Sequence, residues 1–387
     1  MTEKIKTAFS QDMMAWRHTL HRNPELGFEE FETAAFIEAK LQGWGIETHT
    51  GIGGTGVVGV IKGERGPGRN IGLRADMDAL PMQEETGVPY ASTIPNRFHG
   101  CGHDGHTAIL LGVSRYFSQN RDFHGTLNLI FQPAEELLRG GSKMIEDGLF
   151  ERFPCDEIYG LHNHPPLAPG KVGVRTGSIL SACDQFRITI RGIGGHAASP
   201  HRAIDPVMIG ASLIQSLQTV VSRSVDPLQT AVLSVCQFHA GTAINVIASE
   251  AVLEGTVRTL DHDIQALVMA RMKEICHGHA QTYRCEIELD HLLTSPATIN
   301  TANQAQVVRD AATAILGADN VDPDIAPLMA SEDFAYMLQE KPGAYFFLGN
   351  GGYMCHHPKF DFNDEVLPVG MSVMAEIAHQ RLTPLPT

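Results

Sequence analysis

The run His99-Gly100-Cys101-Gly102-His103-Asp104-Gly105-His106 constrains this chain more than any other stretch of it. It places one thiol and three imidazoles between glycines, which let a backbone bend around an ion. Thiolate and imidazole suit zinc and its first-row neighbours, whereas magnesium and calcium prefer oxygen ligands. The spacing alone proves little, because a lone cysteine is as often an inert buried thiol. The run is therefore a candidate metal site that needs partners elsewhere in the chain.

Three other segments can supply such partners. In each, a β-like apolar run ends in a group of polar residues. The run 70–75 leads to Asp76 and Asp78, the run 126–131 leads to Glu135 and Glu136, and the run 157–161 leads to His162 and His164. In open α/β sheets the carboxyl ends of the strands line the ligand crevice, so we expect these polar groups to converge.

The composition limits the class of protein. A chain of 387 residues exceeds the usual size of one core, so two domains are expected. The formal net charge is −15 and the basic residues are scattered, which argues against nucleic acid as a partner. The polar start 1–6 lacks the apolar core of a signal sequence, and no apolar run could span a bilayer. Seven irregularly spaced cysteines do not form a disulfide framework. We therefore expect a cytoplasmic protein without membrane contact.

The order of the elements predicts the fold. Residues 1–181 alternate between strand and helix, which is typical of an α/β domain with a mixed, largely parallel sheet. Residues 182–295 read as an inserted α+β lid or dimerisation domain, with an antiparallel sheet and two helices, and residues 296–387 return to the first domain. The helices are expected at 33–41, 107–117, 206–221 and 264–278, and the main strands at 57–62, 186–192, 231–238, 252–259, 285–289 and 346–349. His103 and Asp104 are predicted just before a helix.

Eight motifs, taken together in order, resemble a known family. They are Leu20-His21-Arg22-Asn23-Pro24-Glu25-Leu26, Leu73-Arg74-Ala75-Asp76-Met77-Asp78-Ala79-Leu80-Pro81, the Cys101 run, Gln132-Pro133-Ala134-Glu135-Glu136, Gly160-Leu161-His162, Gly194-Gly195-His196-Ala197-Ala198, Ser331-Glu332-Asp333-Phe334 and His356-His357-Pro358. The chain resembles the dinuclear metallo-peptidases that include aminoacylases and carboxypeptidases, in their amidohydrolase branch of hippurate and auxin-conjugate hydrolases. The resemblance spans nearly the whole chain.

The resemblance implies two divalent metal ions bridged by Cys101. His103 and His162 would complete the site of one ion, and Glu136 and His356 that of the other. Zinc, manganese, nickel or cobalt would suit these ligands. Arg74 stands where the wider family has a ligating histidine, and it cannot ligate because guanidinium stays protonated. Of the adjacent His356 and His357 only one should ligate, because neighbours on an extended segment point apart.

The resemblance also implies roles around the ions. Glu135 would be the general base, and Asp76 would orient His103 or a neighbouring ligand through its second ring nitrogen. His196 would donate to the oxyanion, from its own chain or from a dimer partner. Asn245 and Arg258 would bind the free carboxylate of the substrate. Ala248 and Ala330 replace the proline and glycine that are usual in relatives, which affects the expected shape of the pocket.

Simpler interpretations of these residues exist. The Glu135-Glu136 pair could be the acidic start of a helix, His196 could cap a turn, and Arg258 could lie on a solvated face. The favoured function is hydrolysis of an N-acyl amino acid, a small molecule, to a carboxylate and a free amino acid. An exopeptidase acting on dipeptides and a non-catalytic binding protein of the same fold are the alternatives. We expect a homodimer or homotetramer.

Overall fold

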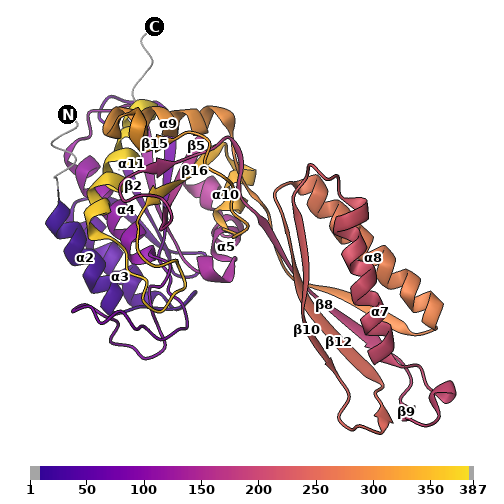
Figure 1. Cartoon of the computed structure of the whole chain (residues 1–387). Coiled ribbons are helices and arrows are strands. Elements are labelled where there is room, and N and C mark those ends of the chain that lie inside the picture. The colour runs from indigo at the N-terminus through magenta and orange to yellow at the C-terminus, as the bar shows by residue number, and fades with distance from the viewer. Residues whose placement is uncertain (1–8, 383–387) are drawn as a thin grey trace. The chain divides into compact units, whose positions relative to one another are not determined.

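The computed structural model describes residues 9–382, so the polar start 1–6 lies outside the described part. The chain divides into two compact units (Figure 1). The first comprises Met1–Ile179, Ile299–Ala326 and Asp333–Thr387, and the second comprises Leu180–Thr298 and Pro327–Glu332. The sequence expectation placed residues 327–332 with the first unit, whereas their contacts group them with the second.

The first unit is built on an eight-stranded sheet. In spatial order its strands are β1 (Glu47–Ile52), β2 (Gly56–Lys62), β4 (Thr126–Gln132), β3 (Asn70–Asp76), β5 (Glu157–His164), β16 (Gly343–Gly349), β6 (Val172–Gly173) and β15 (Val321–Asp322). The central strands β4, β3, β5 and β16 run parallel to one another, whereas β1, β2 and β6 pair with neighbours in antiparallel fashion. This confirms the expected mixed, largely parallel sheet.

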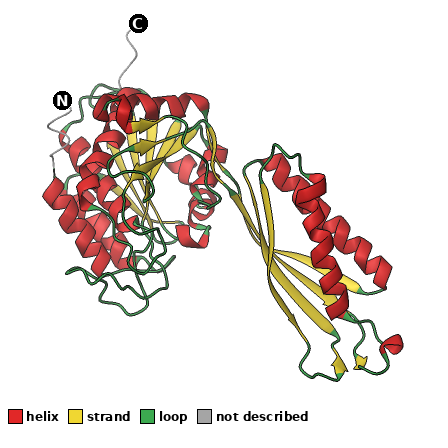
Figure 2. Cartoon of the chain, in the orientation of Figure 1, coloured by secondary structure: helices red, strands yellow, loops and turns green. Residues whose placement is uncertain are grey.

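Helices enclose this sheet (Figure 2). They are α2 (Ser10–Arg22), α3 (Phe31–Gly43), α4 (His103–Gln119), α5 (Gly140–Glu146), α6 (Leu149–Arg152), α9 (Ala302–Leu316), α10 (Phe334–Glu340) and α11 (Leu367–Leu382). Helices α4 and α11 pack together and against β3, while α5 and α10 pack together and against β4 and β5. Because the central strands are covered by helices, they are buried along almost their whole length.

The second unit is a four-stranded antiparallel sheet with two helices on one face (Figure 1). Its strands are ordered β10 (Ala231–Ala240), β12 (Glu250–Thr259), β8 (Ala182–Arg191) and β13 (Glu286–Ser295), and its helices are α7 (Pro206–Thr219) and α8 (His262–Tyr283). The alternation of Phe186, Ile188 and Ile190 on β8 buries one sheet face under these helices. A small ribbon pairs β9 (Gly195–His196) with β11 (Val246–Ile247), and β7 (Gly177–Leu180) and β14 (Thr298–Asn300) lie where the chain passes between the units. The predicted α+β insertion is confirmed.

One local prediction is wrong. His103 and Asp104 were expected just before a helix, but α4 begins at His103 itself. The reason is Gly102, which takes a left-handed conformation with φ of 95° and turns the chain directly into the helix. His103 is thereby held on a rigid element rather than on a loop.

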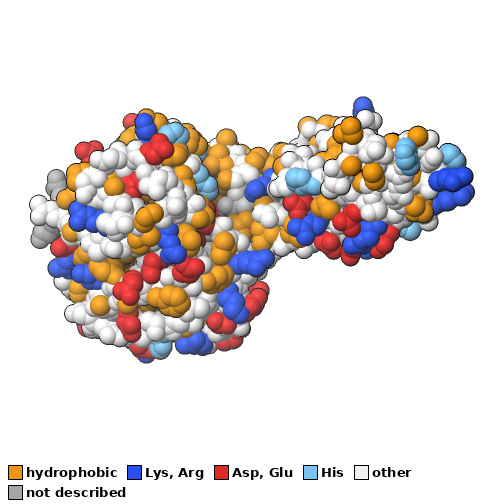
Figure 3. Space-filling view, turned by 90° about the horizontal axis from the view of Figure 1, so that it is seen from below, with side chains coloured by type: hydrophobic (Ala, Val, Ile, Leu, Met, Phe, Trp, Pro, Cys, Tyr) orange, Lys and Arg blue, Asp and Glu red, His pale blue; other side chains and the backbone are white. Residues whose placement is uncertain are grey.

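The surface carries charges of both signs. On the face drawn in Figure 3, lysine and arginine are interspersed with aspartate and glutamate and form no continuous basic stripe. Among the described residues, no helix combines the length and the apolar character needed to cross a membrane.

Candidate metal centre

The five predicted metal ligands come together in the first unit. Two overlapping groups share Cys101: one adds His103 and His162, the other adds Glu136 and His356, and within each group the potential ligand atoms lie within 4.8 Å of one another. Cys101 Sγ is 3.4 Å from His162 Nε2, and His356 Nε2 is 3.4 Å from Glu136 Oε1. The grouping is the one that the resemblance implies.

The fold explains why these residues meet. Cys101 and His103 lead into α4, His162 lies near the carboxyl end of β5, and Glu136 follows β4. Strands β4, β3 and β5 are neighbours and parallel, so the polar residues at their carboxyl ends share one edge of the sheet. His356 is added by the segment after β16, where its backbone N–H donates to the carbonyl oxygen of Gly100 at 2.8 Å.

Hydrogen bonds orient the imidazoles of His162 and His103 toward the cluster. His162 Nδ1 donates to the carbonyl oxygen of Asn163 at 2.7 Å, and His103 Nδ1 lies 3.1 Å from Asp78 Oδ1. A proton on each Nδ1 leaves the Nε2 lone pair as the available ligand atom. His103 Nε2 is buried and makes no hydrogen bond within residues 9–382. Such an orphaned atom among thiol and carboxylate groups fits a bound metal ion.

The electrostatics of the cluster favour a cation. Burial would lower the pKa of His103, but Asp76, Asp78 and Glu136 raise it well above its ordinary value. Burial likewise opposes the ionised form of Glu136, yet His356 and His103 lower its pKa. The buried carboxylates thus require positive charge between them, which a divalent ion supplies while leaving the imidazoles neutral.

Asp76 was expected to orient His103 or a neighbouring ligand through its second ring nitrogen, and at His103 the structure places a different carboxylate there. Asp78 occupies that position, while Asp76 Oδ1 lies 2.6 Å from His106 Nδ1 and Asp76 Oδ2 accepts from Arg74 at 2.7 Å. Asp76 ends β3 and Asp78 lies two residues beyond it, so the two carboxylates contact different histidines of α4. From the sequence, Asp78 was named after the run 70–75 but was given no role. Its position, two residues after Asp76 at the same strand end, was the one indication that it could also contact the cluster.

Glu135 and Glu136 form a tight turn rather than the start of a long helix. The 3₁₀ turn η1 (Glu135–Leu137) follows Ala134, whose φ is 52°. The backbone N–H of Glu136 donates to Asp78 Oδ2 at 3.0 Å. Glu135 Oε2 is 3.8 Å from His103 Nε2, so this carboxylate borders the cluster. A three-residue turn is too short for the helix-dipole interpretation of the pair.

The segment after β16 separates the two adjacent histidines. His356 faces Glu136, whereas the ring of His357 stacks on Tyr353 with centroids 4.4 Å apart. The side chain of His356 is 55% exposed, so solvent reaches the cluster on this side. Cys355, which sequence reasoning did not single out, accepts a hydrogen bond on Sγ from Asn163 Nδ2 at 3.3 Å.

The other three predicted residues belong to the second unit. His196 is exposed, and its Nδ1 accepts from the backbone N–H of Ala198 at 3.0 Å, which leaves the proton of the neutral ring on Nε2. Asn245 lies beside it, because its carbonyl oxygen accepts from the N–H of Ala197 at 3.1 Å. Arg258 lies on β12 and donates to the hydroxyl of Ser331. The structure thus brings His196 and Asn245 together within this unit.

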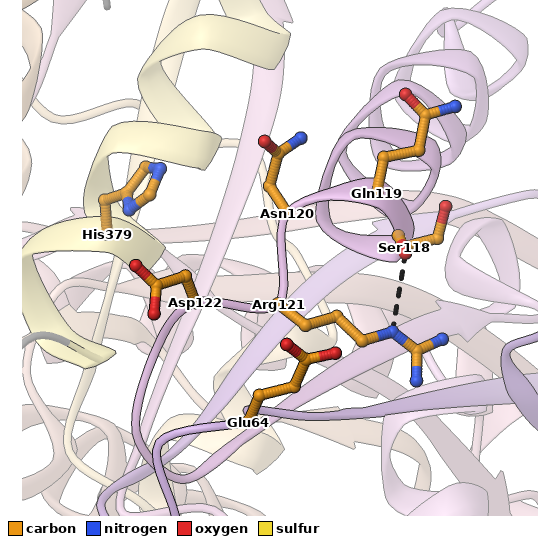
Figure 4. Close-up of a pocket in the computed structure, with 7 residues that line it drawn as sticks. All are labelled: Glu64, Ser118, Gln119, Asn120, Arg121, Asp122 and His379. Atoms are coloured by element: carbon orange, nitrogen blue, oxygen red, sulfur yellow. Dashed lines mark hydrogen bonds between the residues drawn. The ribbon is translucent and has the colours of Figure 1, made fainter.

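A separate cavity of about 520 Å³ opens at the end of α4 (Figure 4). Arg121 Nε there donates to the carbonyl oxygen of Ser118 at 3.4 Å. The lining is polar and contains none of the predicted site residues: Glu64, Ser118, Gln119, Asn120, Arg121, Asp122 and His379. The candidate functional site is therefore not this cavity but the Cys101 cluster, which consists of Cys101, His103, Glu136, His162 and His356.

A mixed α/β unit with metal-ligating groups at its strand ends, interrupted by an α+β unit, defines a class of two-domain metal-dependent hydrolases. The profile of peptidase family M20/M25/M40 matches residues 72–380. The hippurate hydrolase of Campylobacter jejuni is 42% identical over 363 residues, which cover 94% of this chain and 94% of that protein. The chain belongs to peptidase family M20/M25/M40.

Two further relatives agree with this assignment. The N-acetyl-L-cysteine deacetylase of Bacillus subtilis is 41% identical, over 93% of this chain and 86% of that protein. The crystal structure of the Bacillus subtilis YXEP protein, described as a dinuclear metal binding peptidase, superposes with a TM-score of 0.84 and 34% identity. That alignment covers 97% of this chain and 99% of the other.

Proposed function

We propose that this protein is a dinuclear metal-dependent amidohydrolase that cleaves N-acyl amino acids to a carboxylate and a free amino acid. The observation that carries the proposal is the pair of ligand groups sharing Cys101, with Glu135 at their border. The names of the relatives, a hippurate hydrolase and an N-acetyl-L-cysteine deacetylase, support an acylated amino acid as the substrate.

Five residues would hold the ions. Cys101 would bridge them, with His103 and His162 on one side and Glu136 and His356 on the other. Divalent ions bound there supply Lewis acidity, which polarises the amide carbonyl and makes water a better nucleophile. The mixture of thiolate, imidazole and carboxylate suits zinc, manganese, nickel or cobalt. Because a bridging thiol has to stay reduced, we place the protein in the cytoplasm.

The protein's own groups would move the protons. Glu135 would take a proton from the attacking water and give it to the leaving amine nitrogen, so that the C–N bond breaks without expelling an amide anion. His196 would donate its Nε2 proton as a hydrogen bond to the oxyanion, within its own chain or across a dimer. Asn245 and Arg258 would hold the substrate carboxylate, a task that suits the guanidinium fork.

We further propose that the protein forms a homodimer through its second unit. Strand β10 is an edge strand of the four-stranded sheet and exposes Val232 and Phe238. An exposed apolar edge strand is a ready surface for pairing with a second copy. Sedimentation of the metal-loaded protein should give twice the chain mass, and a monomer at micromolar concentration would contradict this proposal.

The experiment that tests the activity combines substrates with one substitution. A panel of N-acetyl, N-benzoyl and indoleacetyl amino acids is compared with dipeptides, and the proposal predicts turnover of the acylated amino acids. Glu135→Gln should lower kcat by about 10²- to 10⁴-fold while leaving the metal content near that of the wild type. Hydrolysis of dipeptides alone would favour the exopeptidase. Turnover of none of these compounds by the metal-loaded wild type would favour a binding protein.

A further inference from the structure

Glu30 is a buried carboxylate to which the proposed chemistry gives no task. It is 0% exposed, and no lysine, arginine or histidine of the described chain pairs with it. Burial raises the pKa of Glu30 to about 7, which shows how unfavourable its charge is in this place. A carboxylate that is fully buried without a cationic partner needs a structural or functional reason.

Glu30 is not needed by its own helix. It stands at the N-cap position of α3 but makes no capping hydrogen bond with its side chain. Glu25 caps the helix instead, because its carboxylate accepts from the backbone N–H groups of Glu32 at 3.2 Å and Thr33 at 2.8 Å. The Glu30 side chain therefore serves something other than the start of α3.

Its contacts lead to the turn that carries Glu135 and Glu136. Oε1 of Glu30 accepts from the backbone N–H of Ala134 at 2.8 Å, and Oε2 accepts from the hydroxyl of Thr55 at 2.5 Å. Ala134 directly precedes η1 and has φ of 52°, a left-handed conformation that costs an L-residue free energy. Gly27, from the same loop as Glu30, lies so close that a Cβ on it would be 3.1 Å from the Ala134 Cα.

The left-handed residue decides where the next two side chains go. If Ala134 took an ordinary conformation, the chain would change direction there, and Glu136 would leave its ligand group and Glu135 the border of the cluster. Two carboxylates hold the turn in place. Glu30 accepts from the N–H of Ala134 before the turn, and Asp78 accepts from the N–H of Glu136 within it. Asp78 also orients His103, so a substitution of Asp78 would disturb a proposed ligand directly. Glu30 makes its other hydrogen bond with Thr55, which is not a proposed ligand, so a substitution of Glu30 reaches the cluster only through the turn.

We propose that Glu30 is a positioning residue, which holds Ala134 in its left-handed conformation and thereby aims Glu135 at the substrate and Glu136 at the metal. The inference rests on the proposed function for the role of Glu135. It does not depend on it for Glu136, whose position is read out by metal binding alone. What matters is a hydrogen-bond acceptor of the right length rather than the charge.

Three substitutions test this proposal, each compared with Glu32→Ala at an exposed position of the same helix start. Glu30→Ala removes the acceptor and should lower kcat by about 30- to 100-fold with little change in KM, since a misplacement of about 1 Å costs on this scale. It should also weaken metal retention against a chelator by about 10-fold. Glu30→Gln keeps an acceptor at the same reach and should stay within about fivefold of the wild type for both quantities. Glu30→Asp keeps the charge but is one methylene shorter, so it should behave like Glu30→Ala.

The outcomes separate this proposal from that of the function. A folded Glu30→Ala protein with wild-type kcat and metal retention would overturn the positioning role. So would a Glu30→Gln protein as impaired as Glu30→Asp, because the charge would then be the essential property. If the Glu30→Ala protein does not fold, kcat and metal retention of Glu30→Gln and Glu30→Asp still test whether a hydrogen-bond acceptor of the right length is what matters. If the wild type hydrolyses no N-acyl amino acid, the proposed function fails, while metal retention in these variants still tests Glu30.

Discussion

Asp78 Oδ1 lies 3.1 Å from His103 Nδ1, and this contact determines which nitrogen of the imidazole faces the Cys101 cluster. The carboxylate keeps the proton on Nδ1 and the lone pair on Nε2, which is the form that a metal ion requires. The other oxygen of Asp78 accepts from the N–H of Glu136. One buried carboxylate therefore aligns one proposed ligand of each ion.

Asp78→Ala should weaken metal binding by about 10- to 100-fold, the usual effect of removing the partner of a ligating histidine. The measurement is the metal content after dialysis against graded concentrations of a chelator. Asp310→Ala, on the exposed face of α9, is the matched control and should retain metal as the wild type does. Equal retention in both variants would show that Asp78 does not orient a ligand.

Cys101 and Cys355 provide a matched pair of thiols. The Cys101→Ser variant should bind metal more than about 100-fold more weakly, which exceeds the usual effect of removing a residue that only hydrogen-bonds a ligand. The reason is that the proposed bridging thiolate belongs to both ions. Cys355→Ser should keep both ions, because Cys355 belongs to neither ligand group. Metal analysis of the two purified proteins checks this. The reverse pattern would mean that the wrong sulfur has been assigned.

Arg74 stabilises the fold beneath the site. It is fully buried, donates to Asp76 at 2.7 Å and to Asp333 at 3.2 Å, and so supplies positive charge to two buried carboxylates. Arg74→Met should lower the free energy of unfolding by about 3–5 kcal/mol, because it leaves these charges uncompensated. Urea denaturation of the metal-free protein measures it. Arg65→Met, which removes an exposed ion pair with Asp122, should change little, and a similarly small change for Arg74→Met would refute the assigned role.

His21 should make stability depend on pH. Burial lowers its pKa, but Asp104, 2.8 Å away, and Glu84 raise it to about 8, above the ordinary value of 6.5. A raised pKa means that the folded state holds the proton more tightly. The stabilisation is therefore fully present below pH 6.5 and is lost as pH rises through about 8.

The size of this effect is up to about 2 kcal/mol, given 1.36 kcal/mol for each unit of pKa. The free energy of unfolding of the metal-free protein, measured between pH 6 and about 9, should fall more steeply for the wild type than for His21→Asn. Parallel curves for the two proteins would contradict the predicted ion pair with Asp104.

Much of the fold follows from local pattern. The helices and strands expected at 57–62, 206–221, 231–238 and 252–259 are found close to those bounds, because burial of one face imposes a regular spacing on the sequence. The start of α4 was misplaced by the prediction, since a left-handed Gly102 can open a helix at the next residue. Element ends depend on single backbone conformations, which periodicity does not record.

The candidate site was predictable only in part. The five proposed ligand residues could be named from the sequence because the motifs that contain them resemble those of a known family. The contacts of Asp78, His106 and Glu30 were not, because each joins residues far apart in the chain: Glu30 and Ala134 are separated by 104 positions. Buried hydrogen bonds of this kind depend on how distant segments pack together, and no local sequence pattern predicts them.

The central claim is that one sulfur atom, that of Cys101, joins two metal ions. Anomalous X-ray diffraction from crystals grown with zinc or manganese tests it directly. The account predicts two peaks, each at a coordination distance of about 2.3–2.6 Å from Cys101 Sγ, one beside His103 and His162 and the other beside Glu136 and His356. Peaks that all lie more than about 5 Å from that sulfur, far outside thiolate coordination, would contradict it.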